Sequence, residues 1–142
     1  MAKAGSATLS AEERAAVKAR ARELKNQATL AAQAEAFTTA IAEMTAEERA
    51  VAEGLHALIG RAAPGLHPKT MYGMPAWANA DNKVICFYQA ATKYKTRYST
   101  FGFQPEAQLD DGEMWETAFA LTALSPASEK KIAALVKKAA GS

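Results

Sequence analysis

The sequence predicts an α+β fold: an antiparallel β-sheet of four or more strands with helices packed on one face, preceded by a helical N-terminal extension. Two observations lead to this prediction. Apolar residues recur at helical spacing before Pro64, and the pattern becomes alternating or continuous after Pro68. Ten of the eleven aromatic residues lie beyond position 71, and aromatic side chains are enriched in strands. Helices should therefore come first and the sheet second.

The first predicted helix opens at a capping box. Ser10 is followed three residues later by Glu13, which is typical of a helix N-terminus, and the helix should reach about Lys25. Its apolar stripe is thin, so it should lie on the surface or against a partner, and a homodimer through this helix is one possibility. Residues 26–44 are also compatible with a helix, but no start signal is visible there. The stripe consists of Val17, Ala21 and Leu24.

A second capping box, Thr45 with Glu48, predicts a stronger helix that ends before Pro64 and Gly65. One face of this helix carries Val51, Leu55, Leu58, Ile59 and Ala62.

The remaining elements are predicted as strands and one last helix. Residues 69–78 and 83–90 should form a hairpin around a turn at residues 79–82. Residues 96–103 and 118–124 should supply two further strands. Ser125 should cap a final helix with Pro126 at its first position. The apolar residues of that helix are Ile132, Leu135 and Val136.

Length and composition indicate one compact domain with a tail. The 142 residues suffice for a single core, and we divide them into a helical extension, 1–44, and an α+β domain, 45–142. The net charge of +2 makes nucleic acid an improbable partner, and no apolar run is long enough to span a membrane. The single cysteine, Cys86, cannot form an internal disulfide, which indicates a cytoplasmic location.

One segment resembles a known family. The stretch from Pro64 to Trp77, PGLHPKTMYGMPAW, is followed by the strand KVICFYQA and a Lys-rich segment. Together they resemble the YdhG-like family of small bacterial proteins of unknown function, which is grouped with YjbR-like and frataxin-like iron-chaperone annotations. The most specific element is the signature 72–75, Tyr-Gly-Met-Pro, and the match runs from about Thr45 to the C-terminus. The resemblance implies a compact α+β fold in the bacterial cytoplasm.

The signature also has a physical interpretation. Gly73 permits a positive φ or a close backbone approach, and Pro75 lacks the N–H that a strand donates to its neighbour. Together they predict a bulge or an edge position in the first strand.

A basic segment suggests an anion site. Lys93, Lys95 and Arg97 alternate with Tyr94, Thr96 and Tyr98, so an extended chain would place three cations on one face. A phosphate, a carboxylate or, as a minor option, a single-stranded nucleic acid could lie along them, with the ring of Tyr98 or Tyr94 at the margin. The alternative is an edge strand that lysines protect from aggregation.

A second candidate is an aromatic cleft for a small molecule. Tyr72, Met74, Trp77, Tyr98 and Trp115 should lie near the loop ends of neighbouring strands. Tyr72 and Trp77 are the foremost candidates because the adjacent glycine and proline disturb the strand ladder. Packing in the core is the alternative for most of these side chains.

An acidic loop is the candidate metal site. Asp110, Asp111 and Glu113 are hard oxygen donors that could hold ferrous iron, the one cofactor that the sequence suggests. The spacing does not match a calcium loop, so a solvated turn is the alternative. His56 and His67 form no metal motif, and Cys86 should be an inert buried thiol.

These observations favour a small cytoplasmic binding or chaperone-like protein for a small molecule or anion, with no catalytic residues assigned. One alternative is a frataxin-like iron chaperone that uses the acidic loop. A second is an uncharacterised enzyme that uses the aromatic cleft. The sequence contains no Gly-rich phosphate loop, no nucleophile elbow and no histidine–carboxylate pair at catalytic spacing, which disfavours the enzyme.

Overall fold

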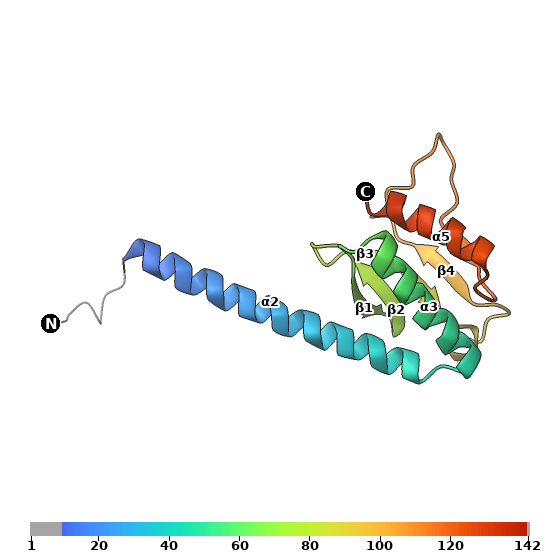
Figure 1. The fold of residues 1–142 in the computed structure, drawn as a ribbon, viewed down its shortest axis with the longest axis horizontal. Helices are drawn as coiled ribbons and strands as arrows, with labels where there is room; N and C mark the ends of the chain where they lie inside the picture. The colour runs from blue at the N-terminus through green and yellow to red at the C-terminus, as the bar shows by residue number, and fades with distance from the viewer. Residues whose placement is uncertain (1–9, 142) are drawn as a thin grey trace. The chain divides into compact units, whose positions relative to one another are not determined.

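A computed structural model of the chain describes residues 10–141, which fall into two compact units that meet at Ala32 and Gln33 (Figure 1). The second unit contains a five-stranded antiparallel sheet in the order β1-β2-β3-β4-β5, with helices α3 and α5 over the sheet. The predicted fold class is confirmed. The elements are α2 (Ala11–Ala42), α3 (Ala46–Ala62), β1 (His67–Met71), β2 (Met74–Ala78), β3 (Val84–Gln89), α4 (Ala91–Tyr94), β4 (Thr100–Phe103), β5 (Ala118–Ala120) and α5 (Pro126–Ala139).

The first unit consists of the N-terminal part of α2. Its capping box is formed as predicted: the Glu13 amide donates to Ser10 Oγ at 3.0 Å, and the Ser10 amide donates to Glu13 Oε1 at 3.0 Å. The helix does not end near Lys25, as predicted, but continues to Ala42, because residues 11–42 contain no glycine or proline. Its apolar side chains are exposed, namely Val17, Leu24 and Leu30.

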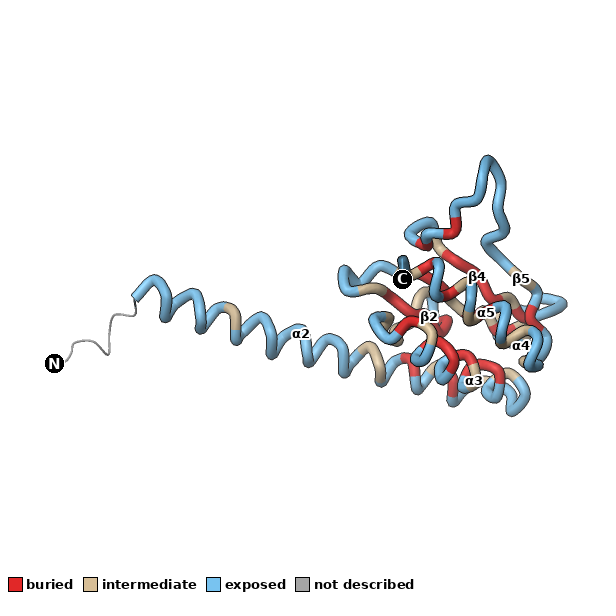
Figure 2. Tube along the Cα trace, turned by 45° about the horizontal axis from the view of Figure 1, so that its top comes forward, coloured by how far each residue is buried: buried red, intermediate tan, exposed pale blue. Residues whose placement is uncertain are grey.

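The core of the second unit is built from the end of α2, from α3 and α5, and from the sheet. Phe37 and Ile41 of α2 are buried in it, so residues 33–42 lie with this unit. As predicted, Thr45 caps α3, accepting the Glu48 amide at 3.2 Å, and α3 buries Val51, Leu55, Leu58 and Ile59. Buried segments concentrate in α3 and in the central strands (Figure 2).

The last helix also begins as predicted. Ser125 Oγ accepts the Ser128 amide at 3.2 Å, and Pro126 occupies the first turn. Ile132 and Val136 are buried against the core, which attaches α5 to the sheet and to α3.

The first predicted hairpin is wrong in one respect that matters for the site. Residues 69–78 are not one strand: β1 and β2 pair as Met71↔Met74, and a two-residue turn at Tyr72 and Gly73 joins them. Both turn residues have positive φ, 52° and 79°, as a type I′ hairpin turn requires. The second position favours glycine, which explains the Tyr-Gly pair.

The prediction that the signature marks a bulge or an edge position is wrong, because Pro75 lies neither in a bulge nor on an edge strand. Strand β2 is flanked by β1 and β3, and its ladder with β3 begins one residue later at Ala76↔Phe87. Pro75 is therefore tolerated just outside the paired part of that ladder, where no N–H is needed. The irregularity of β2 falls instead between Trp77 and Ala78.

The turn at residues 79–82 forms as predicted. Asn79 Oδ1 accepts the amides of Asp81 and Lys83, each at 3.0 Å. This Asx-type bonding closes the loop between β2 and β3 and fixes the register of the central strands.

Two strands are shorter than predicted. Residues 96–99 do not belong to the third predicted strand, which begins at Thr100, because the chain before it forms the short helix α4. Strand β5 ends at Ala120 rather than near Leu124.

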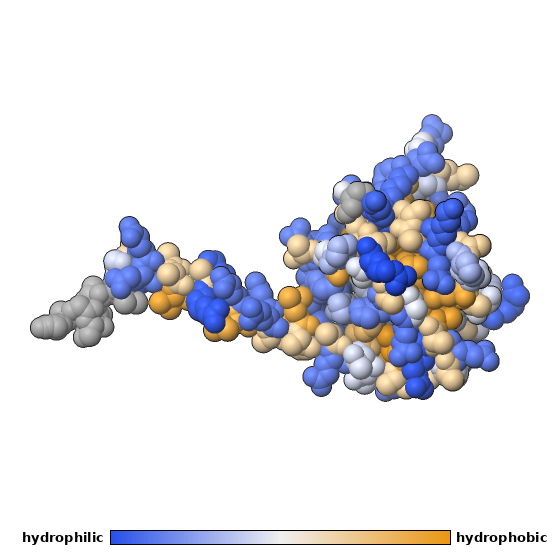
Figure 3. Space-filling view, in the orientation of Figure 1, coloured by the Kyte–Doolittle hydropathy of each residue, from blue (hydrophilic) through white to orange (hydrophobic). Residues whose placement is uncertain are grey.

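On the face of the second unit seen in Figure 3, hydrophilic side chains dominate and hydrophobic ones are scattered among them. Within residues 10–141, no helix is both long and apolar enough to cross a membrane.

The turn conformation predicts opposite outcomes for two glycine substitutions. Gly73→Ala should lower the free energy of unfolding by about 1–2 kcal/mol, because an L-residue is strained at its φ of 79°. The new Cβ would also lie 2.7 Å from Lys93 Nζ. Gly60 lies in the interior of α3, and a new Cβ there has no atom within 4 Å. Gly60→Ala should therefore raise the free energy of unfolding by about 0.5–1 kcal/mol. Urea unfolding of both variants tests this pair, and equal effects would contradict the assigned turn.

Candidate functional site

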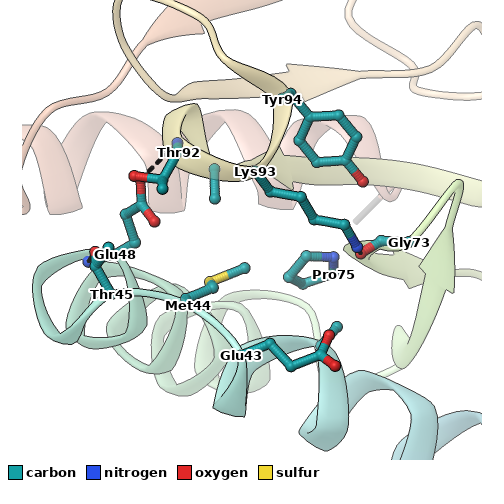
Figure 4. Close-up of a pocket in the computed structure, with 11 residues that line it drawn as sticks. Glu43, Met44, Thr45, Glu48, Gly73, Pro75, Thr92, Lys93 and Tyr94 are labelled. Carbon is teal, nitrogen blue, oxygen red and sulfur yellow. Dashed lines mark hydrogen bonds between the residues drawn. The ribbon is translucent and has the colours of Figure 1, made fainter.

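The candidate site is a hollow of about 330 Å³ in the second unit (Figure 4). It lies where the end of α2, the start of α3, the β1–β2 turn and α4 meet. Its volume is at the lower end of the range for small-molecule sites. The lining residues are Ala40, Glu43, Met44, Thr45, Glu48, Gly73, Pro75, Ala90, Thr92, Lys93 and Tyr94.

One wall of the hollow ties α3 to α4. Glu48 Oε2 accepts the Thr92 amide at 3.0 Å and the Thr92 hydroxyl at 2.9 Å. The Glu48 side chain thus satisfies a backbone donor at the N-terminus of α4. Burial raises the pKa of Glu48, but the hydrogen bonds from Thr92 and Thr45 outweigh it, so the net pKa is lowered and the carboxylate stays ionised.

The opposite wall ties α4 to the β1–β2 turn. The Tyr94 hydroxyl donates to the Tyr72 carbonyl at 2.6 Å, and Lys93 Nζ donates to the Gly73 carbonyl at 3.3 Å. Both bonds cross between segments about twenty residues apart, so they fix the turn over the hollow. They also explain why glycine suits position 73: the side chains of Lys93 and Tyr94 come so close to the backbone that a Cβ there would contact both.

Charged groups face the hollow without a protein partner of opposite charge. Figure 4 shows the Lys93 side chain reaching in from α4 on one side of Pro75 and Glu43 lying on the other side. The structure forms one ion pair among the residues it describes, Arg20 with Glu23, so neither Lys93 nor Glu43 is paired. The floor between them is apolar, with Ala40, Met44, Pro75 and Ala90.

The predicted aromatic cleft does not form. Trp77 is 1 % exposed and belongs to the core, so it cannot present its ring to a ligand. Met74 is also buried, whereas Tyr72 is 86 % exposed on the turn. Tyr98 and Trp115 are partly exposed and line none of the hollows described for residues 10–141. The alternative of core packing is correct for Trp77 and Met74.

The predicted basic stripe is likewise not formed. Lys93 lies in helix α4, Lys95 has a left-handed φ of 56° at the end of that helix, and Arg97 lies in a bend. The three cations therefore do not share one strand face, and Arg97 packs over the Tyr98 ring at 5.1 Å. Of this group, Lys93 lines the hollow.

The acidic residues Asp110, Asp111 and Glu113 lie exposed in the loop between β4 and β5. In the part of the chain that the structure describes, no three His, Cys, Asp or Glu side chains are arranged to hold a metal ion. The convergence that an iron site in this loop requires is thus not seen.

Trp77 has a polar partner that the sequence did not indicate. Its Nε1 donates to His56 Nδ1 at 3.1 Å, and Phe37 packs edge-on against the indole at 5.4 Å. Burial lowers the pKa of His56, which keeps the ring neutral and able to accept this bond. Burial also raises the pKa of Cys86, as expected for an inert thiol.

Comparison of the chain with protein-family models, curated proteins and solved structures finds no match. The function must be argued from the geometry of the site itself.

Sequence reasoning found part of this site and missed part. Gly73 and Pro75 of the signature and Lys93 were singled out, and all three line the hollow. Glu43 and Thr92 were missed, since neither belongs to a motif. Glu48 was recognised only as a capping residue, and its spacing from Thr45 gives no sign of its bonds to Thr92.

The His56–Trp77 bond predicts a pH dependence of stability. Because the folded-state pKa of His56 lies below its unfolded value near 6.5, the unfolded chain binds the proton more readily. Stability should be full above pH 6.5 and should fall as the pH drops towards 5.5. Arg49 and Glu53 are the charged residues that line the same hollow as His56. Denaturant unfolding at pH 7.5 and 5.5 measures the effect.

The control uses the second histidine. His56→Gln should remove most of the fall, and His67→Gln should retain it. An unchanged fall in the His56 variant would contradict the assignment.

Proposed function

We propose that this protein is a binding module for a small organic molecule, held in the hollow between α3, α4 and the β1–β2 turn. The observation that carries the proposal is a pair of charged groups, Glu43 and Lys93, which form no ion pair within residues 10–141 and lie on either side of an apolar floor. Recognition sites for small molecules combine a mainly apolar lining with a few placed polar groups.

The rigidity of the walls supports this proposal. The bonds Glu48–Thr92, Tyr94–Tyr72 and Lys93–Gly73 connect three separate segments around the hollow. When the walls of a site are already ordered before binding, less conformational entropy is lost as the ligand binds, and the affinity is higher.

We also propose that the protein belongs to the YdhG-like family and is located in the cytoplasm. The signature at residues 72–75 supplies the turn and floor of this hollow, so membership of the YdhG-like family and a binding role fit the same residues. We place the protein in the cytoplasm because its one thiol, Cys86, is buried and unpaired. We do not propose catalysis, because the hydroxyl of Thr92 shares its acceptor, Glu48 Oε2, with the Thr92 amide in a bond that ties α4 to α3.

Filling the hollow should abolish binding. Ala40 is partly exposed and lines the hollow from α2, so Ala40→Phe should occupy it without disturbing the core. A thermal-shift screen of small metabolites against the full chain should give ligands that raise the melting temperature by several degrees. At 100 times Kd a ligand adds about 2.7 kcal/mol to stability. These shifts should vanish in Ala40→Phe.

The matched control is Ala36→Phe, one turn earlier on the exposed face of α2. It should keep the shifts of the unmodified chain. Shifts that survive equally in both variants would locate binding elsewhere, and a screen without any shift would refute the proposed function.

A further inference from the structure

We infer that the ligand is a short aliphatic amine of the basic amino acid type, with one carboxylate and two ammonium groups. This inference rests on the proposed function and specifies its ligand. It follows from the charges, the free hydrogen-bonding capacity and the apolar floor of the hollow.

The charges of the lining sum to one excess negative charge. Glu43 and Glu48 contribute two carboxylates, and Lys93 contributes one ammonium group. A basic amino acid carries the opposite set, two ammonium groups and one carboxylate. Each charge of such a ligand would meet a partner, which matters because an unpaired charge is costly to remove from water.

The lining also has hydrogen-bonding capacity to spare, mostly as acceptors. The Glu43 carboxylate accepts no hydrogen bond within residues 10–141, and the Glu48 carboxylate, although it accepts bonds from Thr92 and Thr45, has no cation beside it. The turn presents carbonyls, not amides, towards α4, at Tyr72 and Gly73. The two carboxylates, with these two carbonyls beside them, favour a ligand rich in N–H donors.

Lys93 supplies the complementary donor. Its ammonium group has three N–H donors, and one is directed to the Gly73 carbonyl at 3.3 Å. The remaining donors can bind the carboxylate of an amino acid. A diamine without a carboxylate would lose this contact and retain the others.

The floor suits the carbon chain of the same ligand. Ala40, Met44, Pro75 and Ala90 offer apolar surface between the charged groups, and the thioether of Met44 adapts to a flexible chain. A dicarboxylate or a phosphate would instead place negative charge beside Glu43 and Glu48, which opposes binding.

Calorimetry of the full chain with three probes tests this inference. L-Lysine should bind most tightly, 1,5-diaminopentane more weakly, and pentanedioate not detectably. Glu43 is exposed, so Glu43→Gln should fold normally and should weaken L-lysine binding by about tenfold through loss of a charge-assisted bond. Lys93→Met should weaken the binding of L-lysine more than that of 1,5-diaminopentane, because only L-lysine has a carboxylate that loses its partner. Glu35→Gln, exposed on α2 outside the hollow, is the control and should change nothing.

The outcomes separate the inference from the proposed function. Tight binding of pentanedioate that depends on Lys93 and not on Glu43 would overturn the ligand class and leave the site intact. L-Lysine binding that is equal in Glu43→Gln, Glu35→Gln and the unmodified chain would also overturn it. Failure of all three probes overturns the ligand class, whereas the Ala40→Phe screen decides whether the hollow binds any small molecule. Unfolding curves confirm that Lys93→Met, which also loses the Gly73 bond, remains folded.

Discussion

The candidate site depends on one connection, the pair of hydrogen bonds from α4 to the β1–β2 turn. The Tyr94 hydroxyl donates a hydrogen bond to the Tyr72 carbonyl, and the Lys93 ammonium group donates one to the Gly73 carbonyl. A two-residue turn with positive φ at both positions would otherwise be one of the exposed and mobile tips that such hairpins form. Because these bonds from α4 fix the position of the turn, the turn forms one wall of the hollow. The hollow, its charges and its apolar floor follow from that arrangement.

The other walls are built from groups whose first task is structural. Thr45 caps α3, and Glu48 accepts the Thr92 amide in the short helix α4. Pro75 lies one residue before the ladder between β2 and β3 and forms part of the floor. Two residues later Trp77 anchors the same strand in the core, through His56 and Phe37. The site is thus attached to the buried core of the second unit, which favours a fixed geometry for binding.

The sequence predicts the helices and the order of the strands because their signals are local. Thr45 and Ser125 sit in well-known capping contexts, and the apolar face of α3 is complete in its own residues. The Tyr72–Gly73 turn was missed because the residues on either side are compatible with one continuous strand. Alternating charge over residues 93–97 predicts an extended segment, whereas a single helical turn such as α4 leaves little periodicity to detect. Contacts such as Glu48 with Thr92, 44 residues apart, depend on tertiary packing and leave no pattern in the sequence.

The most direct test of the central claim locates the bound molecule on the full chain. An amide nuclear magnetic resonance titration with L-lysine reports each backbone position separately. Our account predicts that the largest shift changes cluster at Gly73, Thr92 and Lys93 and at the first turn of α3, with little change in the acidic loop around Gly112. Shift changes concentrated in that loop or along residues 11–32, with none at Gly73 and Thr92, would contradict it.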